Sequence, residues 1–161
     1  MTRGERVIAF IERYCIVPEG KLLGKPMRLD PFQKEFILAV YDNPVGTDKA
    51  ILSIARKNGK TGLIAGILLA HLVGPEAVQN TQIVSGALSR EQASIVFNLA
   101  VKMVNLNPDL QVLVHIIPSC KKLIGLPCNV ESKAVSAEGK TTHGLYPILA
   151  ILDETGQVRG P

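Results

Sequence analysis

The stretch Ser53–Thr61 reads SIARKNGKT, and its last three residues, Gly59-Lys60-Thr61, directly precede a strongly apolar segment. They match the end of the phosphate-loop pattern G-x-x-x-x-G-K-[ST], although Ile54 stands where the pattern has its first glycine. Such a loop turns backbone N–H groups toward one point and adds a lysine for the phosphates and a hydroxyl for Mg²⁺. On the tripeptide alone, an ordinary loop before a helix is the more frequent explanation.

The flanking segments favour the phosphate loop. Lys49–Ala55 (KAILSIA) is a short apolar run that predicts a strand, and Gly62–Val73 predicts a buried helix that stops at Gly74-Pro75. The 12 residues of this helix are well short of a membrane span, which needs about 20. We therefore predict phosphate binding by the loop residues Ala55, Arg56, Lys57, Asn58, Gly59, Lys60 and Thr61.

A second Gly-Lys-Thr sequence, Gly139-Lys140-Thr141, serves as an internal control. It is followed by Gly144 and Pro147, which do not permit a phosphate-facing helix at this point. We interpret this copy as a loop that leads into the next strand.

The second chemical signal is an apolar strand that ends in two carboxylates. Pro147–Leu152 (PILAIL) runs directly into Asp153-Glu154. A nucleotide hydrolase needs one carboxylate for the Mg²⁺ shell and another to polarise the attacking water. Asp153 would take the first role and Glu154 the second, whereas the plain alternative is a solvated loop after a strand.

The remaining periodicity alternates between helices and strands. Helical spacing or capping signals mark residues 3–15, 31–42 and the segment from Ser89 to Val104, and short strands are predicted at 81–86, 112–117, 122–124 and 130–137. Asp30-Pro31 supplies the start of the second helix, and Asn107-Pro108 ends the third of these segments. This order predicts an α/β fold with a largely parallel sheet flanked by helices.

Composition narrows the class of protein. The 161 residues, 47% hydrophobic and 20% charged, fit one globular domain and exclude disorder as the main state. The net charge is +4, and the excess lies in residues 1–61, with eleven Lys/Arg against seven Asp/Glu, which suits a phosphate-bearing ligand or a solvated basic face. The start lacks a secretory signal, and the three cysteines form no C-x-x-C pair, so we expect a cytosolic protein with reduced thiols and no zinc site.

The other polar candidates have ordinary alternatives. Arg56 and Lys57 are placed to meet charge on a γ-phosphoryl group or to remain exposed in a loop. The amide of Gln33 has the donor and acceptor that an adenine edge needs, although an exposed helical glutamine is the default. The histidines lack the spacing of a metal triad, so we predict structural roles for them.

At the level of motifs, the sequence resembles the N-terminal ATPase region of the large terminase subunit of tailed bacteriophages. The resemblance rests on R-L-D-P-F-Q at Arg28–Gln33, A-R-K-N-G-K-T at Ala55–Thr61, S-R-E-Q-A at Ser89–Ala93, and T-H-G-L-Y-P through L-D-E from Thr142 to Glu154. The missing first glycine is usual in that family. By this resemblance, adenine recognition falls on Gln33, the phosphate-loop arginine on Arg56, phosphate and Mg²⁺ contacts on Lys60 and Thr61, metal binding on Asp153 and the catalytic base on Glu154.

The resemblance also implies an architecture. We expect a P-loop NTPase domain of the additional-strand type over residues 1–161, with a helical adenine-side segment at 1–48 and the P-loop core at 49–161. ATP and Mg²⁺ are the implied ligands. The implied partners of the full motor are double-stranded DNA, the portal protein and the small terminase subunit in the bacterial host cytoplasm, with no membrane.

Large terminases continue beyond the Asp-Glu pair into a coupling motif and a nuclease domain, and this chain stops at Pro161. We therefore expect a C-terminally incomplete domain that lacks the nuclease and the central strand between the Asp-Glu strand and the phosphate-loop strand. Two alternatives stay open, namely another P-loop motor such as a helicase, and a non-catalytic prophage remnant that binds nucleotide or partner proteins.

Overall fold

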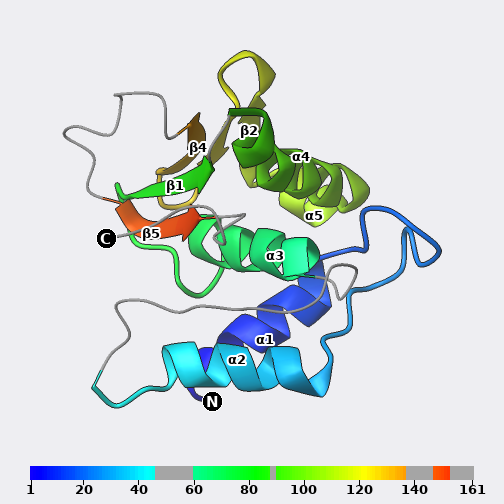
Figure 1. Cartoon of the computed structure of the whole chain (residues 1–161), viewed down its shortest axis with the longest axis vertical. Coiled ribbons are helices and arrows are strands. Elements are labelled where there is room, and N and C mark those ends of the chain that lie inside the picture. The colour runs from blue at the N-terminus through cyan, green and yellow to red at the C-terminus, as the bar shows by residue number, and fades with distance from the viewer. Residues whose placement is uncertain (46–59, 88–89, 137–146, 153–161) are drawn as a thin grey trace.

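The computed structural model describes residues 1–45, 60–87, 90–136 and 147–152. Within them lie the helices α1 (Arg3–Tyr14), α2 (Pro31–Tyr41), α3 (Lys60–Leu72), α4 (Arg90–Leu106) and α5 (Pro108–Gln111). The strands are β1 (Gln82–Ala87), β2 (Val114–Ile117), β3 (Lys122–Gly125), β4 (Val130–Ser136) and β5 (Pro147–Leu152), and a 3₁₀ turn η1 (Pro118–Cys120) precedes β3. Figure 1 shows three levels, in which α3 lies between the sheet and the pair α1 and α2.

The sheet is mixed, and the expectation of a largely parallel sheet is wrong for the described strands. Their order is β2-β3-β4-β1-β5, in which β1 pairs parallel with β4 and β5, whereas β2–β3 and β3–β4 are antiparallel. The cause is the length of the connections, because parallel neighbours need a crossover of a dozen or more residues. Only the η1 turn with Lys121 joins β2 to β3, and only 126–129 join β3 to β4.

The first two helices begin where the sequence predicted. Thr2 caps α1 in a reciprocal capping box with Glu5. Asp30 is the N-cap of α2, and Pro31 is its first residue. The carboxylate of Asp42, just after α2, accepts hydrogen bonds from the Gly4 N–H and the Thr2 hydroxyl, both at 2.8 Å, and so holds the end of α2 against the start of α1.

The helix α3 is the centre of the core. Its residues Leu63, Leu68, Leu69 and Leu72 are almost completely buried, as the apolar run predicted. Close packing with α1 depends on Gly66, where an added Cβ would lie 3.3 Å from the side chain of Ile11. The helix α1 therefore lies between α2 and α3 and joins them (Figure 1).

The two faces of the sheet differ in polarity. Residues in register on one face, such as Ile83, Ser132 and Ala134, are buried, and both α3 and α4 pack against β1 and β4. On the other face, Lys122 of β3 forms an ion pair with Glu131 of β4 at 2.7 Å. Because successive side chains of a strand point to opposite faces of the sheet, the hydrophobic core lies on one face.

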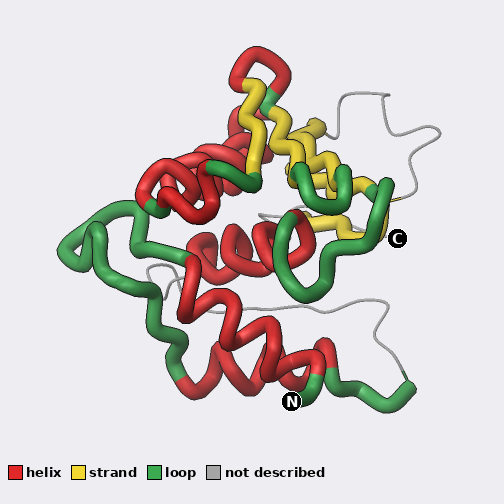
Figure 2. Tube along the Cα trace, turned by 180° about the vertical axis from the view of Figure 1, so that it is seen from behind, coloured by secondary structure: helices red, strands yellow, loops and turns green. Residues whose placement is uncertain are grey.

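Some boundaries differ from the prediction. Pro108 begins the short helix α5, with Asn107 as its N-cap, and Val112 is the C-cap of this helix, so β2 starts at Val114 instead of Val112. The predicted strand 49–55, the capping residue Ser89 and the loop with the second Gly-Lys-Thr sequence lie outside the described residues. From behind, Figure 2 shows the long loop between α1 and α2 reaching toward α4, where Glu19 pairs with Lys102 at 2.8 Å.

Candidate nucleotide-binding site

The parallel strands define one edge of the sheet where a ligand site is expected. Strands β4, β1 and β5 run in the same direction, and Leu152 at the end of β5 is in register with Gly86 near the end of β1. In α/β sheets, ligands bind outside the carboxyl ends of the strands. The strand β5 ends at Leu152, as the sequence predicted, so Asp153 and Glu154 follow directly from this edge in the chain.

The helix α3 begins at Lys60, so Lys60 and Thr61 are its first two residues. This confirms the predicted helix that follows Gly59. The N-terminus of a helix carries free N–H groups and a partial positive charge, which suit a phosphate. The other predicted residues, Ala55, Arg56, Lys57, Asn58, Gly59, Asp153 and Glu154, lie outside the described residues, so their roles stay predictions.

Gln33 is not the exposed glutamine of the default interpretation, since it is only 4% exposed. Its Oε1 accepts a hydrogen bond from the Asp30 N–H at 2.9 Å, and its own backbone N–H donates to the Asp30 carbonyl. The carboxamide therefore has a structural role at the start of α2. The same contact fixes its orientation, because only the oxygen end can accept from an N–H.

The segment before α2 is held by the end of α1. The Oε2 atom of Glu12 accepts a hydrogen bond from the Leu29 N–H at 3.0 Å and lies 3.8 Å from Lys34 Nζ. The preceding Met27 donates its N–H to the Cys15 carbonyl at 3.0 Å. No pattern in the sequence identified Glu12, because its backbone partner is 17 residues away along the chain.

Met27 also connects this segment to α3. A Cβ added to Gly62, in the first turn of α3, would lie 3.2 Å from the Met27 Cε. The structure thus brings the chain just before R-L-D-P-F-Q against the first turn of the helix that Lys60 begins. These are two of the regions that the sequence assigned to one nucleotide.

A buried polar pair joins the far ends of α2 and α3. The Tyr41 hydroxyl and the His71 Nε2 are 2.7 Å apart, and the His71 Nδ1 is buried without a hydrogen-bond partner. Burial lowers the pKa of His71 to about 4, against a raising effect of Glu76, and burial raises the pKa of Tyr41. Arg3 covers the Tyr41 ring and pairs with Glu76. This confirms a structural role for His71.

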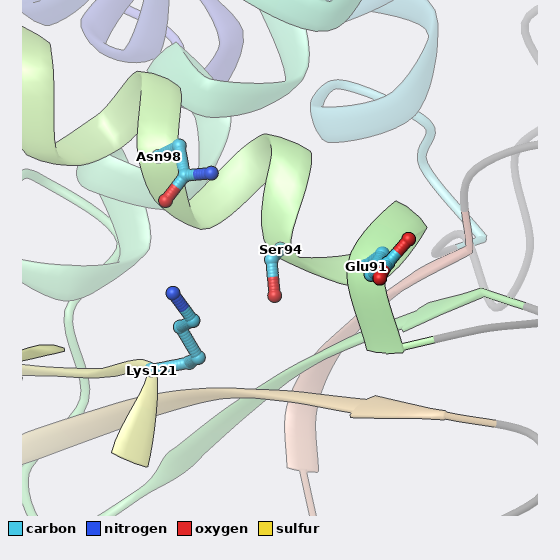
Figure 3. A pocket seen from close by; sticks show the side chains of 4 residues that line it. All are labelled: Glu91, Ser94, Asn98 and Lys121. Carbon is cyan, nitrogen blue, oxygen red and sulfur yellow. The ribbon is translucent and has the colours of Figure 1, made fainter. Parts of the chain in front are cut away.

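A separate hollow of about 340 Å³ lies between α4 and the turn before β3. Figure 3 shows Glu91, Ser94 and Asn98 along α4, with Lys121 facing them from the turn. The four described residues that line it are not among the predicted nucleotide residues. Its mixed polar lining defines no ligand class.

The described part of the chain contains no group of three His, Cys, Asp or Glu residues able to hold a metal ion. Cys15, Cys120 and Cys128 form no disulfide within the same residues. No helix in the same ranges has the length and apolar content of a membrane span.

A mixed α/β sheet with a parallel centre, an apolar helix starting at Gly-Lys-Thr and a parallel strand running into Asp-Glu together indicate an ATPase domain. The sequence profile of the terminase large subunit, ATPase domain, matches residues 31–160. The chain therefore belongs to the terminase large subunit family, and the resemblance in the sequence motifs is confirmed.

Two comparisons, one of sequence and one of structure, agree with this assignment, and both are with the large terminase of phage HK97. The terminase large subunit of Enterobacteria phage HK97 is 91% identical over 161 residues, which cover all of this chain and 32% of that protein. The crystal structure of the HK97 bacteriophage large terminase matches with a TM-score of 0.91 and 88% identity, over 100% of this chain and 33% of that one. The chain thus spans about a third of the length of these relatives.

Proposed function

We propose that the chain binds ATP with Mg²⁺ and that, in the full-length protein, it hydrolyses ATP to drive double-stranded DNA into a phage capsid. The observation that carries the proposal is the profile match over residues 31–160, which includes every predicted site residue. The start of α3 at Lys60 and the end of β5 before Asp153 support it. The helicase and non-catalytic alternatives are not favoured by the family assignment.

In the proposed site, the loop Ala55–Thr61 holds the phosphates and Gln33 contacts adenine. Thr61 and Asp153 would hold Mg²⁺, whose charge offsets that of the β and γ phosphates. Arg56 stabilises charge on the γ-phosphoryl group, and Glu154 orients and polarises the attacking water.

We also propose a division of the chain into two parts, the partners of the full-length protein and its cellular location. Residues 1–48 form the helical adenine side and 49–161 the P-loop core, and the chain spans about a third of the length of the HK97 terminase large subunit. The partners of the full-length protein are DNA, the portal protein and the small terminase subunit. It acts in the bacterial host cytoplasm.

Calorimetric titration with Mg-ATP tests the nucleotide site. Lys60→Ala is expected to weaken ATP binding about tenfold to a hundredfold, since it removes a charge-assisted phosphate contact. The matched control is Lys140→Ala, in the second Gly-Lys-Thr sequence, which is expected to leave the affinity unchanged. An equal loss in both variants, or no loss in Lys60→Ala, contradicts the assignment.

Phosphate release tests the catalytic step. We expect the 161-residue chain to turn ATP over far below the ~1 to 10³ s⁻¹ of common enzymes, because it spans only about a third of the length of the HK97 protein that it resembles. Robust turnover that disappears in Glu154→Gln contradicts this expectation and shows that the chain hydrolyses ATP through Glu154. Turnover that is the same in both proteins comes from a contaminant.

A further inference from the structure

We propose that Glu12 is a positioning residue for base recognition, because it holds the backbone that orients the Gln33 carboxamide. The inference rests on the proposed adenine contact of Gln33. It assigns the selectivity of that contact to a residue of α1, outside the region 31–160 that the family profile matches.

Two hydrogen bonds in series connect Glu12 to the Gln33 carboxamide. Glu12 Oε2 accepts from the Leu29 N–H at 3.0 Å, and the next backbone N–H, that of Asp30, donates to Gln33 Oε1 at 2.9 Å. The carboxylate thus fixes one peptide unit, and the adjacent peptide unit fixes the carboxamide. A hydrogen bond to a carboxylate is stronger than one between neutral groups, so it is a firm anchor.

Burial makes this anchor effective. Leu29 is 6% exposed and Gln33 is 4% exposed, so the backbone between them has little room to rearrange. Lys34, 3.8 Å from Glu12 Oε2, adds a favourable charge from the first turn of α2. The Glu12 side chain therefore fixes the segment before α2 to α1, in addition to apolar packing.

Orientation of the carboxamide decides which base it accepts. With Oε1 held on the Asp30 N–H, the second lone pair of this oxygen would accept from the amino group that adenine carries at C6. Guanine places a carbonyl oxygen at the same position, and two facing oxygens repel. A carboxamide that is free to turn would present its NH₂ group to guanine, so loss of the anchor lowers the preference for adenine.

The test compares the affinities of the 161-residue chain for Mg-ATP, Mg-GTP and inorganic tripolyphosphate, measured by calorimetry. Glu12→Ala is expected to lower the ATP-to-GTP affinity ratio about tenfold and to leave tripolyphosphate binding unchanged. Glu12→Gln keeps an acceptor oxygen and is expected to restore part of the ratio, and it replaces Glu12→Ala if that variant does not fold. The matched control is Glu19→Ala, which removes another carboxylate that pairs with a lysine, Lys102, away from α2.

Gln33→Ala distinguishes a failure of the positioning role of Glu12 from a failure of the adenine contact of Gln33. If Gln33→Ala lowers the ratio and the Glu12 variants do not, the positioning role is wrong and the adenine contact stands. If neither changes the ratio, the adenine contact itself is wrong, and the inference fails with it. An equal loss of affinity for ATP, GTP and tripolyphosphate in Glu12→Ala shows a general structural role and also overturns the inference.

Discussion

Acid is expected to weaken the fold through His71, and the size of the effect follows from its burial. The pKa of this imidazole falls from 6.5 to about 4, mainly because burial opposes the charged form, while Glu76 raises the pKa and Arg3 lowers it. A folded-state pKa below the unfolded one means that the stabilisation is complete above pH 6.5 and is lost as the pH falls toward 4. Linkage between these two values gives a loss of about 2 kcal/mol from pH 7.5 to pH 5.

The assay is urea unfolding, followed by circular dichroism at both pH values, for the wild type and His71→Gln. The variant removes the titrating group, so its free energy of unfolding is expected to change by about 2 kcal/mol less over this range than that of the wild type. His115→Gln, at an exposed histidine of β2, is the matched control. Asp42 and Glu5 also have lowered pKa values, but their stabilisation is lost only below their ordinary values of 3.8 and 4.5.

A wild type and a His71→Gln variant that lose stability equally between pH 7.5 and pH 5 would refute the reasoning. The comparison uses the change with pH, so a lower overall stability of the variant does not affect it. Such a result would mean that His71 is protonated in the folded state without cost, for example through a partner for the Nδ1 atom that the described residues do not supply.

Three further expectations concern the core and the surface. Gly125→Ala should destabilise the protein by about 1 to 3 kcal/mol in urea unfolding, because an added Cβ would lie 2.2 Å from the Leu72 carbonyl oxygen; an unchanged midpoint would contradict this packing. Leu69→Ala, at a completely buried position of α3, should cost about 2 to 5 kcal/mol by the same measurement, and a cost below 1 kcal/mol would place α3 outside the core. Lys102→Ala should cost less than about 1 kcal/mol, since its ion pair with Glu19 is more than half exposed on both sides, and a larger loss would show that the pair anchors the long loop.

Much of the fold was predictable because its signals are local. The starts of α1 and α2 follow from caps and a proline and lie at their predicted residues, and the apolar run predicts α3, which begins two residues before Gly62. The direction of the strands β2 and β3 was not predicted, since an apolar run looks the same in parallel and antiparallel pairs. The short connections before and after β3 held that information, because a few residues leave no room for a crossover.

The sequence predicts the residue types of the proposed site, and this part stays a prediction, but it does not indicate which contacts support the site. Gly-Lys-Thr before an apolar helix and Asp-Glu after an apolar strand are patterns of neighbours in the chain, and the family assignment agrees with them. The hydrogen bond of Gln33 to Asp30 is local, because it belongs to the capping box of α2, whereas the hydrogen bond of the Leu29 N–H to Glu12 joins the segment before α2 to α1. No periodicity contains that information, because it arises from a turn that brings residues 17 positions apart into contact.

The helix α1 was predicted from local signals in the sequence, but its contacts with distant residues were not. The family profile begins at residue 31, yet α1 contacts both elements that the proposed nucleotide needs. Its Ile11 packs at Gly66 of α3, and its Glu12 holds the backbone in front of α2. Adjacent residues on one helix therefore set the position of the phosphate-side helix and of the adenine-side segment, so a change in either contact alters the spacing between the two. The proposed recognition of the base and of the phosphates would thus depend on a helix that carries none of the predicted ligand contacts.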